Sequence, residues 1–355
     1  MPDLRSSSPD LDTSSLTMTE VVLPGVVEPA GLQLHTRPRP TPGRGEALVA
    51  VLASGVSFAE QSMRRGRYPG QPRFPFVPGY DLVGTVLAVG PEADPGLVGT
   101  RVAAMTKTGG WATHAVLRAH DLVPVPDGVG AAEAETLVVN GITAWQLLHR
   151  TARVRPGQTV LVHGASGGVG TALVQLAVGH GVRVIGTASP RHHDALRAMG
   201  AEPVDYAADG LTERLRALAP SGVDAAFDHL GGESLLRSWS LLAPGGRLVS
   251  YAIAAGLDGE GSLVATFVAT LARLLWWNVL PNGHRAGFYN VWAGHLVRPR
   301  AFRARLRADL STVLGLLADG ALTAQVAARL PLERAAEAME LAESHTVRGK
   351  VVLLP

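Results

Sequence analysis

The sequence predicts an α/β protein with a doubly wound parallel sheet and a second, mainly β domain. Three observations lead to this prediction. Thr159–Gly186 reads as a strand, a glycine-rich turn, a helix and a second strand. Helical and strand patterns then alternate up to residue 251, which is typical of a parallel sheet covered by helices. Residues 21–139 contain many short apolar runs broken by Gly and Pro, which indicates a region of strands.

The Thr159–Gly186 region has the pattern of a nucleotide-binding unit. Val160–Val162 is an apolar run, as in a strand buried on both faces, and Val182–Ile185 gives the second strand. Between them lie a glycine-rich turn and a helix that ends at Gly181. Without Cβ atoms the turn backbone can approach a pyrophosphate closely, and the helix N-terminus stabilises its charge. The expected cofactor-binding residues of this turn are Gly164, Ala165, Gly167, Gly168, Val169 and Gly170.

The glycine pattern of this turn departs from the usual GxGxxG. Ala165 occupies the place of the first glycine, while Gly167 and Gly170 occupy the other two. The alternative interpretation is an ordinary glycine-rich turn of some other α/β protein. The strands and the helix on either side favour the nucleotide site.

Composition narrows the class of protein. The chain has 355 residues, of which 46% are hydrophobic and 17% charged, so it can form two substantial cores. The net charge of +2 is too small to indicate nucleic-acid binding. The absence of cysteine excludes disulfides, thiolate-bound zinc and a cysteine nucleophile. No basic and then apolar signal segment opens the chain, so we expect a cytoplasmic protein.

The first half of the chain is expected to hold a tail and the β domain. Residues 1–19 are rich in Ser, Asp, Thr and Pro without periodicity, which predicts a mobile tail. The clearest strand patterns that follow are Ala47–Leu52, Leu82–Val89 and Arg101–Met105. Gly141–Arg150 has a helical pattern and leads into the first nucleotide-binding strand.

The second half continues the alternation and then returns to the β domain. Helices are expected at Pro190–Met199, Leu211–Leu218 and Ser234–Leu242, and strands at Pro203–Asp205, Val223–Phe227 and Arg247–Tyr251. A helix with one apolar face follows at residues 302–317. Gln325–Leu330 and Lys350–Leu354 read as strands around a helix at Leu332–Ala342, and they have no partner left in the parallel sheet. We therefore assign residues 20–143 and 321–355 to the β domain and residues 144–320 to the nucleotide-binding domain.

The segment Leu263–Leu280 is unusually apolar. Its 18 residues approach the length of a membrane span, but Arg273 and Asn278 lie inside it. A helix buried against another domain or subunit is the favoured interpretation. Peripheral membrane contact through Leu274, Trp276 and Trp277 is the alternative.

Several motifs together resemble the zinc-free quinone oxidoreductase branch of the medium-chain dehydrogenase/reductases, from about residue 20 to the end of the chain. They are Gly55–Glu60, Arg64–Pro69, Pro78–Gly84, His163–Gly170 and Gly349–Leu353. The resemblance implies a GroES-like β domain beside a Rossmann domain, a homodimer, and hydride transfer from a nicotinamide cofactor to a quinone or an α,β-unsaturated carbonyl.

The resemblance also implies a reaction without metal. Zinc-containing relatives carry Cys where Ser57 stands and His within the segment where Tyr80 stands. Serine and tyrosine are poor zinc ligands, so we expect no zinc. The remaining candidates for hydrogen bonding to the substrate carbonyl are Tyr80, Tyr68 and Ser57, with Tyr80 as the first choice. Packing of Tyr80 beneath the turn is the alternative.

The cofactor is expected to be NADPH. An NAD site presents a carboxylate after the second strand, but here Ser189 and Arg191 follow that strand without an acid until Asp194. The guanidinium group of an arginine binds the 2′-phosphate of NADPH well. Arg191 as a surface charge without a ligand is the alternative. The family resemblance adds to the expected cofactor-binding set Asn140, Thr143, Tyr206, Leu230, Tyr251 and Lys350.

The sequence thus predicts an NADPH-dependent oxidoreductase that acts on a small quinone or enone. A non-catalytic NADPH-binding protein that acts through a partner or a membrane surface is the alternative, and the Leu263–Leu280 segment is the reason to keep it.

Overall fold

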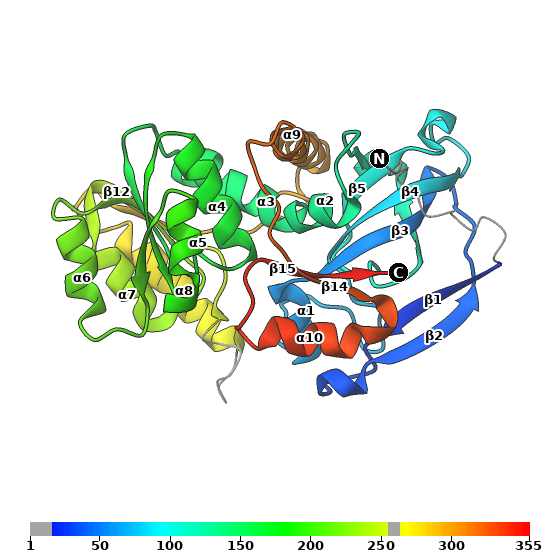
Figure 1. Ribbon diagram of the computed structural model, residues 1–355, viewed down its shortest axis with the longest axis horizontal. Helices are drawn as coiled ribbons and strands as arrows, with labels where there is room; N and C mark the ends of the chain where they lie inside the picture. Colours follow the sequence, from blue (N-terminus) through cyan, green and yellow to red (C-terminus); the bar gives the residue numbers. More distant parts are fainter. Residues whose placement is uncertain (1–15, 255–262) are drawn as a thin grey trace, which may run out of the picture.

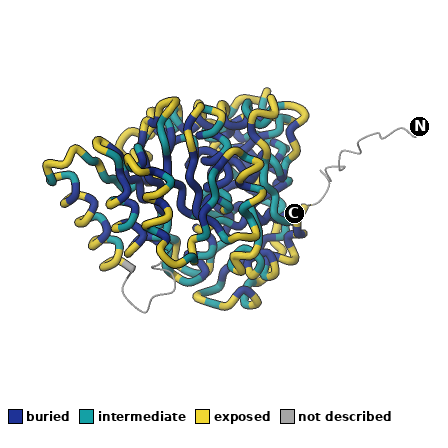
Figure 2. Tube along the Cα trace, turned by 60° about the vertical axis from the view of Figure 1, so that its left-hand side comes forward, coloured by how far each residue is buried: buried dark blue, intermediate teal, exposed yellow. Residues whose placement is uncertain are grey.

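The computed structural model describes residues 16–254 and 263–355 of the chain. Figure 1 shows two lobes, one containing β12 and the helices α4–α8, the other containing β1–β5, β14 and β15. The helices α2 (Ala131–Leu137), α3 (Val139–Trp145) and α9 (Pro299–Ala318) lie where the two lobes meet. Figure 2 shows that buried residues fill the interior of the molecule, while exposed residues lie mainly on its outer loops and helix faces.

The first lobe contains a parallel sheet. Within the described residues it has six strands in the order β10-β9-β8-β11-β12-β13, and every neighbouring pair is parallel. This is the doubly wound Rossmann order, in which the chain starts at the centre and winds outward in both directions. The strands are β8 (Thr159–Val162), β9 (Arg183–Ala188), β10 (Glu202–Asp205), β11 (Val223–Asp228), β12 (Leu242–Ser250) and β13 (Arg285–Phe288).

Helices cover both faces of this sheet because its strands are apolar on both sides. Val160 and Val162 belong to one buried cluster and Leu161 to another, as the period of two in a strand requires. The first cluster includes side chains of α4 (Gly168–Gly179) and α5 (His193–Ala198). The second includes side chains of α6 (Leu211–Leu218), α7 (Gly232–Ser240) and α8 (Leu263–Trp277).

The second lobe contains a mainly antiparallel sheet. Among the described residues its strand order is β14-β15-β3-β4-β5-β7, with β6 also paired to β3. These strands are β3 (Glu46–Val56), β4 (Asp81–Val89), β5 (Arg101–Met105), β6 (His114–Arg118), β7 (Val123–Pro124), β14 (Val326–Pro331) and β15 (Lys350–Leu354). The short helix α1 (Phe58–Arg64) follows β3, and α10 (Ala335–Glu343) connects β14 to β15. The chain therefore returns to this sheet at its end, as the sequence indicates.

The start of the folded chain differs from the prediction. The tail was expected to reach residue 19, but Thr17–Val22 forms β1, which pairs antiparallel with β2 (Gln33–Pro38). Met18 is buried, and the backbone N–H of Thr19 donates to the hydroxyl of Thr113. Residues 17–19 are thus part of the fold. Residues 1–15 of the predicted tail lie outside the described residues.

Two helical stretches also differ from their predicted form. The helix expected at Gly141–Arg150 begins earlier as α3 and ends as a π-helical turn over Gln146–Ala152. The buried carboxylate of Asp309 on α9 accepts hydrogen bonds from Gln146 and Arg150 in this turn, so α9 fixes its position. The segment expected to be a helix from residue 263 to residue 280 is α8, which ends at Trp277 and leads into β13.

Candidate dinucleotide and substrate site

The glycine turn lies between β8 and the N-terminus of α4, as the sequence predicts. Thr171 donates the first hydrogen bond of the helix, to the carbonyl of Gly167, at 2.9 Å. Gly167 is the N-cap residue and contributes no side-chain hydrogen bond. The first N–H groups of α4 therefore point out of the helix end, where the helix dipole favours an anion.

Lack of a side chain matters at two positions of this turn. Gly164 has a φ of +62°, and a Cβ there would lie 2.3 Å from the ring of His229. A Cβ on Gly168 would lie 2.3 Å from the side-chain nitrogen of Asn140. Ala165, the departure from GxGxxG, is fully buried and packs toward Gly186 of β9, where a Cβ would lie 2.7 Å from its own. The Cβ of Ala165 thus has room in the turn because the neighbouring strand carries glycine at position 186.

The ends of β9 and β10 bring the predicted phosphate-binding residues to the same edge of the sheet. Ser189 follows β9 directly, and its hydroxyl accepts a hydrogen bond from Arg191 Nε at 3.2 Å. Arg191 is exposed. Tyr206 follows the adjacent strand β10 and is also exposed. Because both strands are parallel to β8, these side chains lie beyond the carboxyl ends of the strands, where ligands bind in open α/β sheets.

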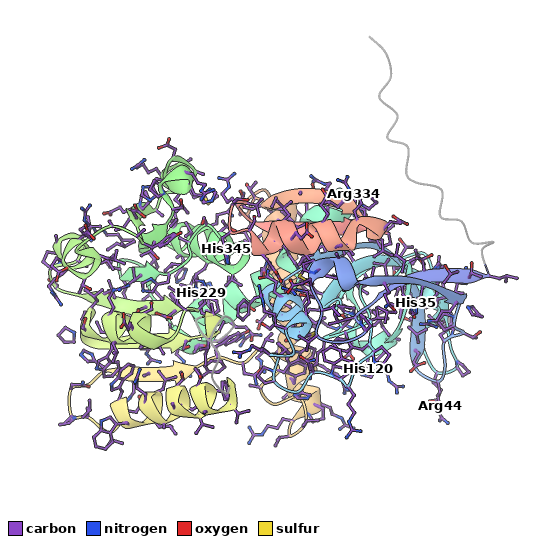
Figure 3. All side chains as sticks on the ribbon, turned by 90° about the horizontal axis from the view of Figure 1, so that it is seen from below. His35, Arg44, His120, His229, Arg334 and His345 are labelled. Carbon is purple, nitrogen blue, oxygen red and sulfur yellow. The ribbon has the colours of Figure 1, made fainter. Side chains whose placement is uncertain are left out.

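A second cation reaches this edge from the far end of the chain. The pKa of His192 is lowered by its partial burial and by the charges of Arg191 and Arg348. Arg348 precedes β15, so it belongs to the segment that returns from α10. In this segment the backbone N–H of Gly349 donates to the carbonyl of Ser166, and Figure 3 shows His345 near the interface between the lobes. Sequence reasoning missed Arg348, because only the return of the chain brings its charge within range of His192.

Asp228 at the end of β11 organises the next loop. Its Oδ1 accepts from the backbone N–H groups of Leu230 and Gly231, each at 2.9 Å, and its Oδ2 accepts from Ser234 Oγ at 2.6 Å. The backbone N–H of Leu230, a predicted cofactor-binding residue, is thus hydrogen-bonded to the buried carboxylate of Asp228. Tyr251 at the end of β12 donates its backbone N–H to the Asp228 carbonyl. These bonds fix the loop that borders the glycine turn.

His229 in the same loop has an unsatisfied polar atom. Its Nδ1 is buried and has no hydrogen-bond partner among the described residues. Its ring lies against Gly164 and 5.8 Å from the ring of Tyr251. An unpaired buried nitrogen beside a glycine turn fits a bound ligand that supplies the missing hydrogen bond.

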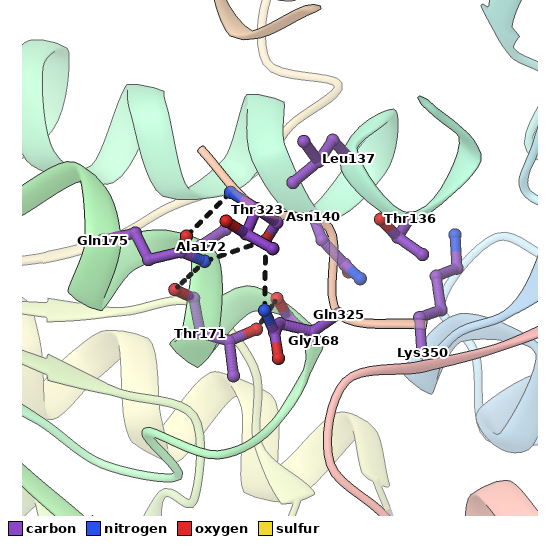
Figure 4. Close-up of a pocket in the computed structure, with 10 residues that line it drawn as sticks. All are labelled: Thr136, Leu137, Asn140, Gly168, Thr171, Ala172, Gln175, Thr323, Gln325 and Lys350. Atoms are coloured by element: carbon purple, nitrogen blue, oxygen red, sulfur yellow. Dashed lines mark hydrogen bonds between the residues drawn. The ribbon is translucent and has the colours of Figure 1, made fainter. Parts of the chain in front are cut away.

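The seam between the lobes carries the predicted nicotinamide-side residues. Figure 4 shows Asn140 of α3 facing Gly168 of α4, with Gln175 hydrogen-bonded to Thr323. Asn140 and Thr143 are both buried. The residues that line this narrow pocket are Thr136, Leu137, Asn140, Gly168, Thr171, Ala172, Gln175, Thr323, Gln325 and Lys350.

Lys350 was expected to bind the cofactor, but its ammonium group is fully occupied by the protein. Nζ lies 2.8 Å from both carboxylate oxygens of Asp81 and 2.7 Å from Glu135 Oε1. An ammonium group has three donors, so these acceptors use all of them. Burial raises the pKa of Glu135, an effect that the Lys350 charge opposes. Lys350 therefore provides one positive charge that both buried carboxyl groups contact, and it joins the last strand to β4 and α2.

Tyr80 and Tyr68 form the polar centre of the expected substrate site, together with a residue that sequence reasoning missed. The two hydroxyls are 2.5 Å apart, and Trp292 Nε1 donates to the Tyr80 hydroxyl at 2.5 Å. Burial raises the pKa of both phenols, so both are protonated at neutral pH. Trp292 lies between β13 and α9, 212 residues from Tyr80, and no local pattern predicts their contact.

The protons of this cluster can be counted. An indole N–H only donates, so the Tyr80 oxygen accepts from Trp292. The two phenols share one hydrogen bond, which uses one of their two protons. The other proton is available to a substrate oxygen. Tyr80 is only 4% exposed and Tyr68 is more accessible, so Tyr68 is better placed to offer that proton outward.

Ser57 has a structural role in the helix that carries Glu60. It is the N-cap of α1, and its Oγ accepts a hydrogen bond from the N–H of Ala59. Its own hydroxyl proton goes to Glu60, whose other oxygen accepts the backbone N–H of Tyr80 at 2.6 Å. Ser57 is therefore committed to the capping box, and Glu60 holds the backbone of Tyr80 in place.

The side chains at the two former metal positions do not fit zinc. Ser57 caps a helix, Tyr80 is hydrogen-bonded to Tyr68 and Trp292, and the chain contains no cysteine. In the part of the chain that the structure describes, no group of three His, Asp or Glu side chains could hold a metal ion.

The fold and the site define a two-domain protein in which a Rossmann sheet and a GroES-like sheet enclose a dinucleotide site. Comparisons with known proteins agree. Residues 43–127 match the alcohol dehydrogenase GroES-like domain, and residues 199–353 match a family described as zinc-binding dehydrogenase. The human synaptic vesicle membrane protein VAT-1 homolog is 33% identical over 91% of this chain and 83% of its own length.

Solved structures give the same result. A mycobacterial protein in complex with NADPH has a TM-score of 0.80 and 30% identity, covering 95% of this chain and 100% of that one. A quinone oxidoreductase of Pseudomonas syringae has a TM-score of 0.82 and 26% identity, covering 95% of this chain and 100% of its own. The chain belongs to the quinone oxidoreductase-like branch of the medium-chain dehydrogenase/reductases.

Proposed function

We propose that the protein is an NADPH-dependent oxidoreductase that reduces a quinone or an α,β-unsaturated carbonyl without a metal ion. The observation that carries this proposal is Arg191 beside Ser189 after the end of β9, where an NAD site would carry a carboxylate. The 30% identical mycobacterial structure in complex with NADPH supports the same cofactor.

The residues of the site fit this cofactor. The open N–H groups of α4 and the bare backbone at Gly167 would take the pyrophosphate, and Arg191 with Ser189 would hold the 2′-phosphate. Asn140 supplies polar atoms beside Gly168, and His229 supplies them beside Gly164. When bound, NADPH supplies the hydride for the reduction.

The protein's own contribution to the reaction is a hydrogen bond to the oxygen that gains negative charge. Trp292 donates a hydrogen bond to the Tyr80 oxygen, and the hydroxyls of Tyr80 and Tyr68 share a second hydrogen bond. One phenolic proton remains for the substrate carbonyl. A fixed donor in a site of low polarity stabilises developing charge strongly, because it needs little reorganisation. Glu60 acts as a positioning residue, since it fixes the backbone of Tyr80.

The chemistry of the donor set supports a metal-independent reaction. An alcohol dehydrogenase reaction through a zinc-bound alkoxide needs soft or nitrogen ligands, and Ser57 and Tyr80 are committed to other bonds. A hydrogen bond from a phenol, in place of a zinc ion, would then stabilise the negative charge on the substrate oxygen.

The experiment that tests the proposed function measures cofactor oxidation with a panel of quinones and enones, once with NADPH and once with NADH, in the presence of a strong chelator. We expect turnover with NADPH and at least one acceptor, and much less with NADH. Tight NADPH binding without turnover on any acceptor would contradict the enzymatic proposal.

A further inference from the structure

His229 has a buried ring nitrogen that the protein itself does not use. It follows β11 directly, and among the described residues its Nδ1 has no hydrogen-bond partner. The carboxylate of the preceding residue, Asp228, is engaged elsewhere, with hydrogen bonds from Leu230, Gly231, Ser234 and Ser238. A buried polar atom without a partner is costly, so we expect its partner to come from a ligand.

The place of His229 in the sheet indicates which kind of ligand can reach it. Its ring lies against the glycine turn, since a Cβ on Gly164 would lie 2.3 Å from its Cε1. Its centroid is 5.8 Å from that of Tyr251, which follows β12. Both residues come after parallel strands, so both lie at the carboxyl edge of the sheet. Ligands of open α/β sheets bind at this edge.

A second histidine shows that an unpaired nitrogen alone does not indicate a ligand. The Nδ1 of His284 is also buried and, within the part of the chain that the structure describes, has no partner. His284 precedes β13, however, so it lies at the amino edge of the same parallel sheet. Its ring packs edge to face against that of Trp239, at 5.2 Å. His284 is therefore a matched control for His229, with the same unpaired atom at the wrong edge for a dinucleotide.

The aromatic cluster beside His284 also decides two of the predicted membrane contacts. Leu274 and Trp277 of α8 are buried, and the ring of Trp277 stacks on that of Trp239 at 4.7 Å, whereas Trp276 is exposed. The prediction is therefore wrong for Leu274 and Trp277, which belong to the core of the Rossmann lobe. No helix within the described ranges is long and apolar enough to cross a membrane.

The strand order assigns His229 to one half of a dinucleotide. The order β10-β9-β8-β11-β12-β13 means that the direction of winding reverses between β8 and β11. A dinucleotide crosses the sheet at this point, with one half on each side. Ser189 and Arg191 follow β9 and Tyr206 follows β10, so that side takes the adenosine half with its 2′-phosphate. His229 follows β11 on the other side, which leaves it to the nicotinamide half.

The chemistry of the ring narrows the group that it can bind. Burial lowers the pKa of His229, the charge of Asp228 opposes this effect, and the charge of His345 adds to it, so the ring is neutral at neutral pH. A neutral imidazole has one donor and one acceptor nitrogen. A hydroxyl can donate or accept and pairs with Nδ1 in either tautomer, whereas a phosphate oxygen only accepts. In the nicotinamide half of NADPH, the ribose carries such hydroxyls.

We propose that Nδ1 of His229 binds a ribose hydroxyl in the nicotinamide half of the cofactor. The inference rests on the proposed function, because it takes NADPH as the ligand of the glycine turn. The hydrogen bond would orient the ribose to which the nicotinamide ring is attached. His229 would then serve NADPH and NADH alike, whereas Arg191 would distinguish them by the 2′-phosphate.

The test measures the affinities of NADPH, NADH and 2′,5′-ADP by isothermal titration calorimetry on the full chain. The last of these has the adenosine half and its 2′-phosphate but no nicotinamide ribose. His229→Phe keeps a ring against Gly164 and removes both nitrogens. It should weaken NADPH and NADH by the same factor, about 2- to 12-fold for one neutral hydrogen bond, and leave 2′,5′-ADP unchanged. His229→Asn has an amide that can donate or accept, and it should restore most of the affinity.

Two control variants separate this role from a general disturbance of the site. Arg191→Ala should give the opposite pattern, with weaker binding of NADPH and 2′,5′-ADP and unchanged binding of NADH. His284→Phe removes the unpaired nitrogen at the amino edge of the sheet, and it should bind all three molecules like the parent.

The outcomes distinguish this inference from the proposed function. Unchanged binding of both cofactors to His229→Phe would overturn the inference alone. Weaker binding of 2′,5′-ADP to this variant, or a His229→Asn variant as weak as His229→Phe, would also overturn it, because the loss would then come from a distorted turn. A parent that binds neither cofactor would overturn both. Thermal unfolding shows that each variant is folded, and His229→Leu replaces His229→Phe, with the same expectations, where the latter is not.

Discussion

Arg191 is the residue on which cofactor choice is expected to depend. It is exposed and donates a hydrogen bond to Ser189, and its charge and that of Arg348 both lower the pKa of His192. A charge-assisted hydrogen bond contributes about 1.5–3 kcal/mol, so Arg191→Ala should weaken NADPH roughly 10- to 150-fold. NADH affinity should barely change. Fluorescence titration of both cofactors checks this, with Arg197→Ala, an arginine paired to Asp194 on α5, as the control. Equal weakening of both cofactors would make Arg191 a structural residue.

Tyr68 and Tyr80 can be separated by their effects on turnover. Tyr68→Phe removes the accessible donor and should lower kcat on the order of 100-fold or more. Tyr80→Phe removes the partner that positions Tyr68 but leaves its proton available, so the loss of kcat should be smaller. Steady-state kinetics with one active acceptor checks both, and NADPH affinity should be unchanged in each. A larger loss in Tyr80→Phe would return the donor role to Tyr80.

His163 is expected to make stability depend on pH. It is fully buried between Thr187 and Ser238, and burial lowers its pKa to about 4. Between about pH 6.5 and pH 4 the unfolded chain binds a proton there that the native protein does not, so the free energy of unfolding falls as the pH falls. The fall should total roughly 3 kcal/mol, at 1.36 kcal/mol per pKa unit. Urea unfolding across this range checks it. His163→Gln should flatten the profile, and an unchanged slope would assign the acid sensitivity to other groups.

At the scale of elements, the turn between β8 and α4 gives the sharpest stability test. Gly157 and Gly164 both have positive φ, but a Cβ on Gly157 meets nothing within 4 Å, whereas one on Gly164 meets the His229 ring. Gly157→Ala should cost about 1–2 kcal/mol from backbone strain alone. Gly164→Ala should cost more, and it should also weaken NADPH, because His229 must move. Thermal unfolding and cofactor titration compare the two. Equal losses of stability in the two variants, with unchanged NADPH affinity, would mean that the His229 ring moves aside at no cost.

The elements that sequence predicts well are those whose signal is local. The glycine turn and β8 combine apolar periodicity and glycine spacing within 30 residues, and the structure confirms them. β1 was missed because Thr17–Thr19 is polar on its outer side, and only pairing with β2 and contact with Thr113 stabilise it. The site residues Trp292 and Arg348 were missed for the same reason, since each meets its partners across a long loop of chain.

At the scale of the whole molecule, Lys350 joins the last strand to β4 and α2 and is expected to contribute strongly to stability. It is the counter-ion of both Asp81 and Glu135. Lys350→Met would leave two buried carboxylates unpaired and should destabilise the protein by about 3–5 kcal/mol. The double variant Lys350→Met/Glu135→Gln should recover part of this loss, because only one unpaired carboxylate remains. Urea midpoints of the two variants decide the matter, and equal midpoints would refute the role of Glu135.

The return of the last strand also sets the order in which the protein can be completed during synthesis. β15 pairs with β3 on one side and β14 on the other, while Gly349 bonds to the glycine turn. The ribosome makes these residues after all the other strands of the two sheets. Until they leave it, the edge of β3 is open, Asp81 and Glu135 lack their cation, and the dinucleotide site lacks one wall. A nascent chain can therefore form the Rossmann sheet early, but its antiparallel sheet closes only once residues 349–354 have left the ribosome, and a chain that stops before Gly349 would lack both a finished sheet and a finished site.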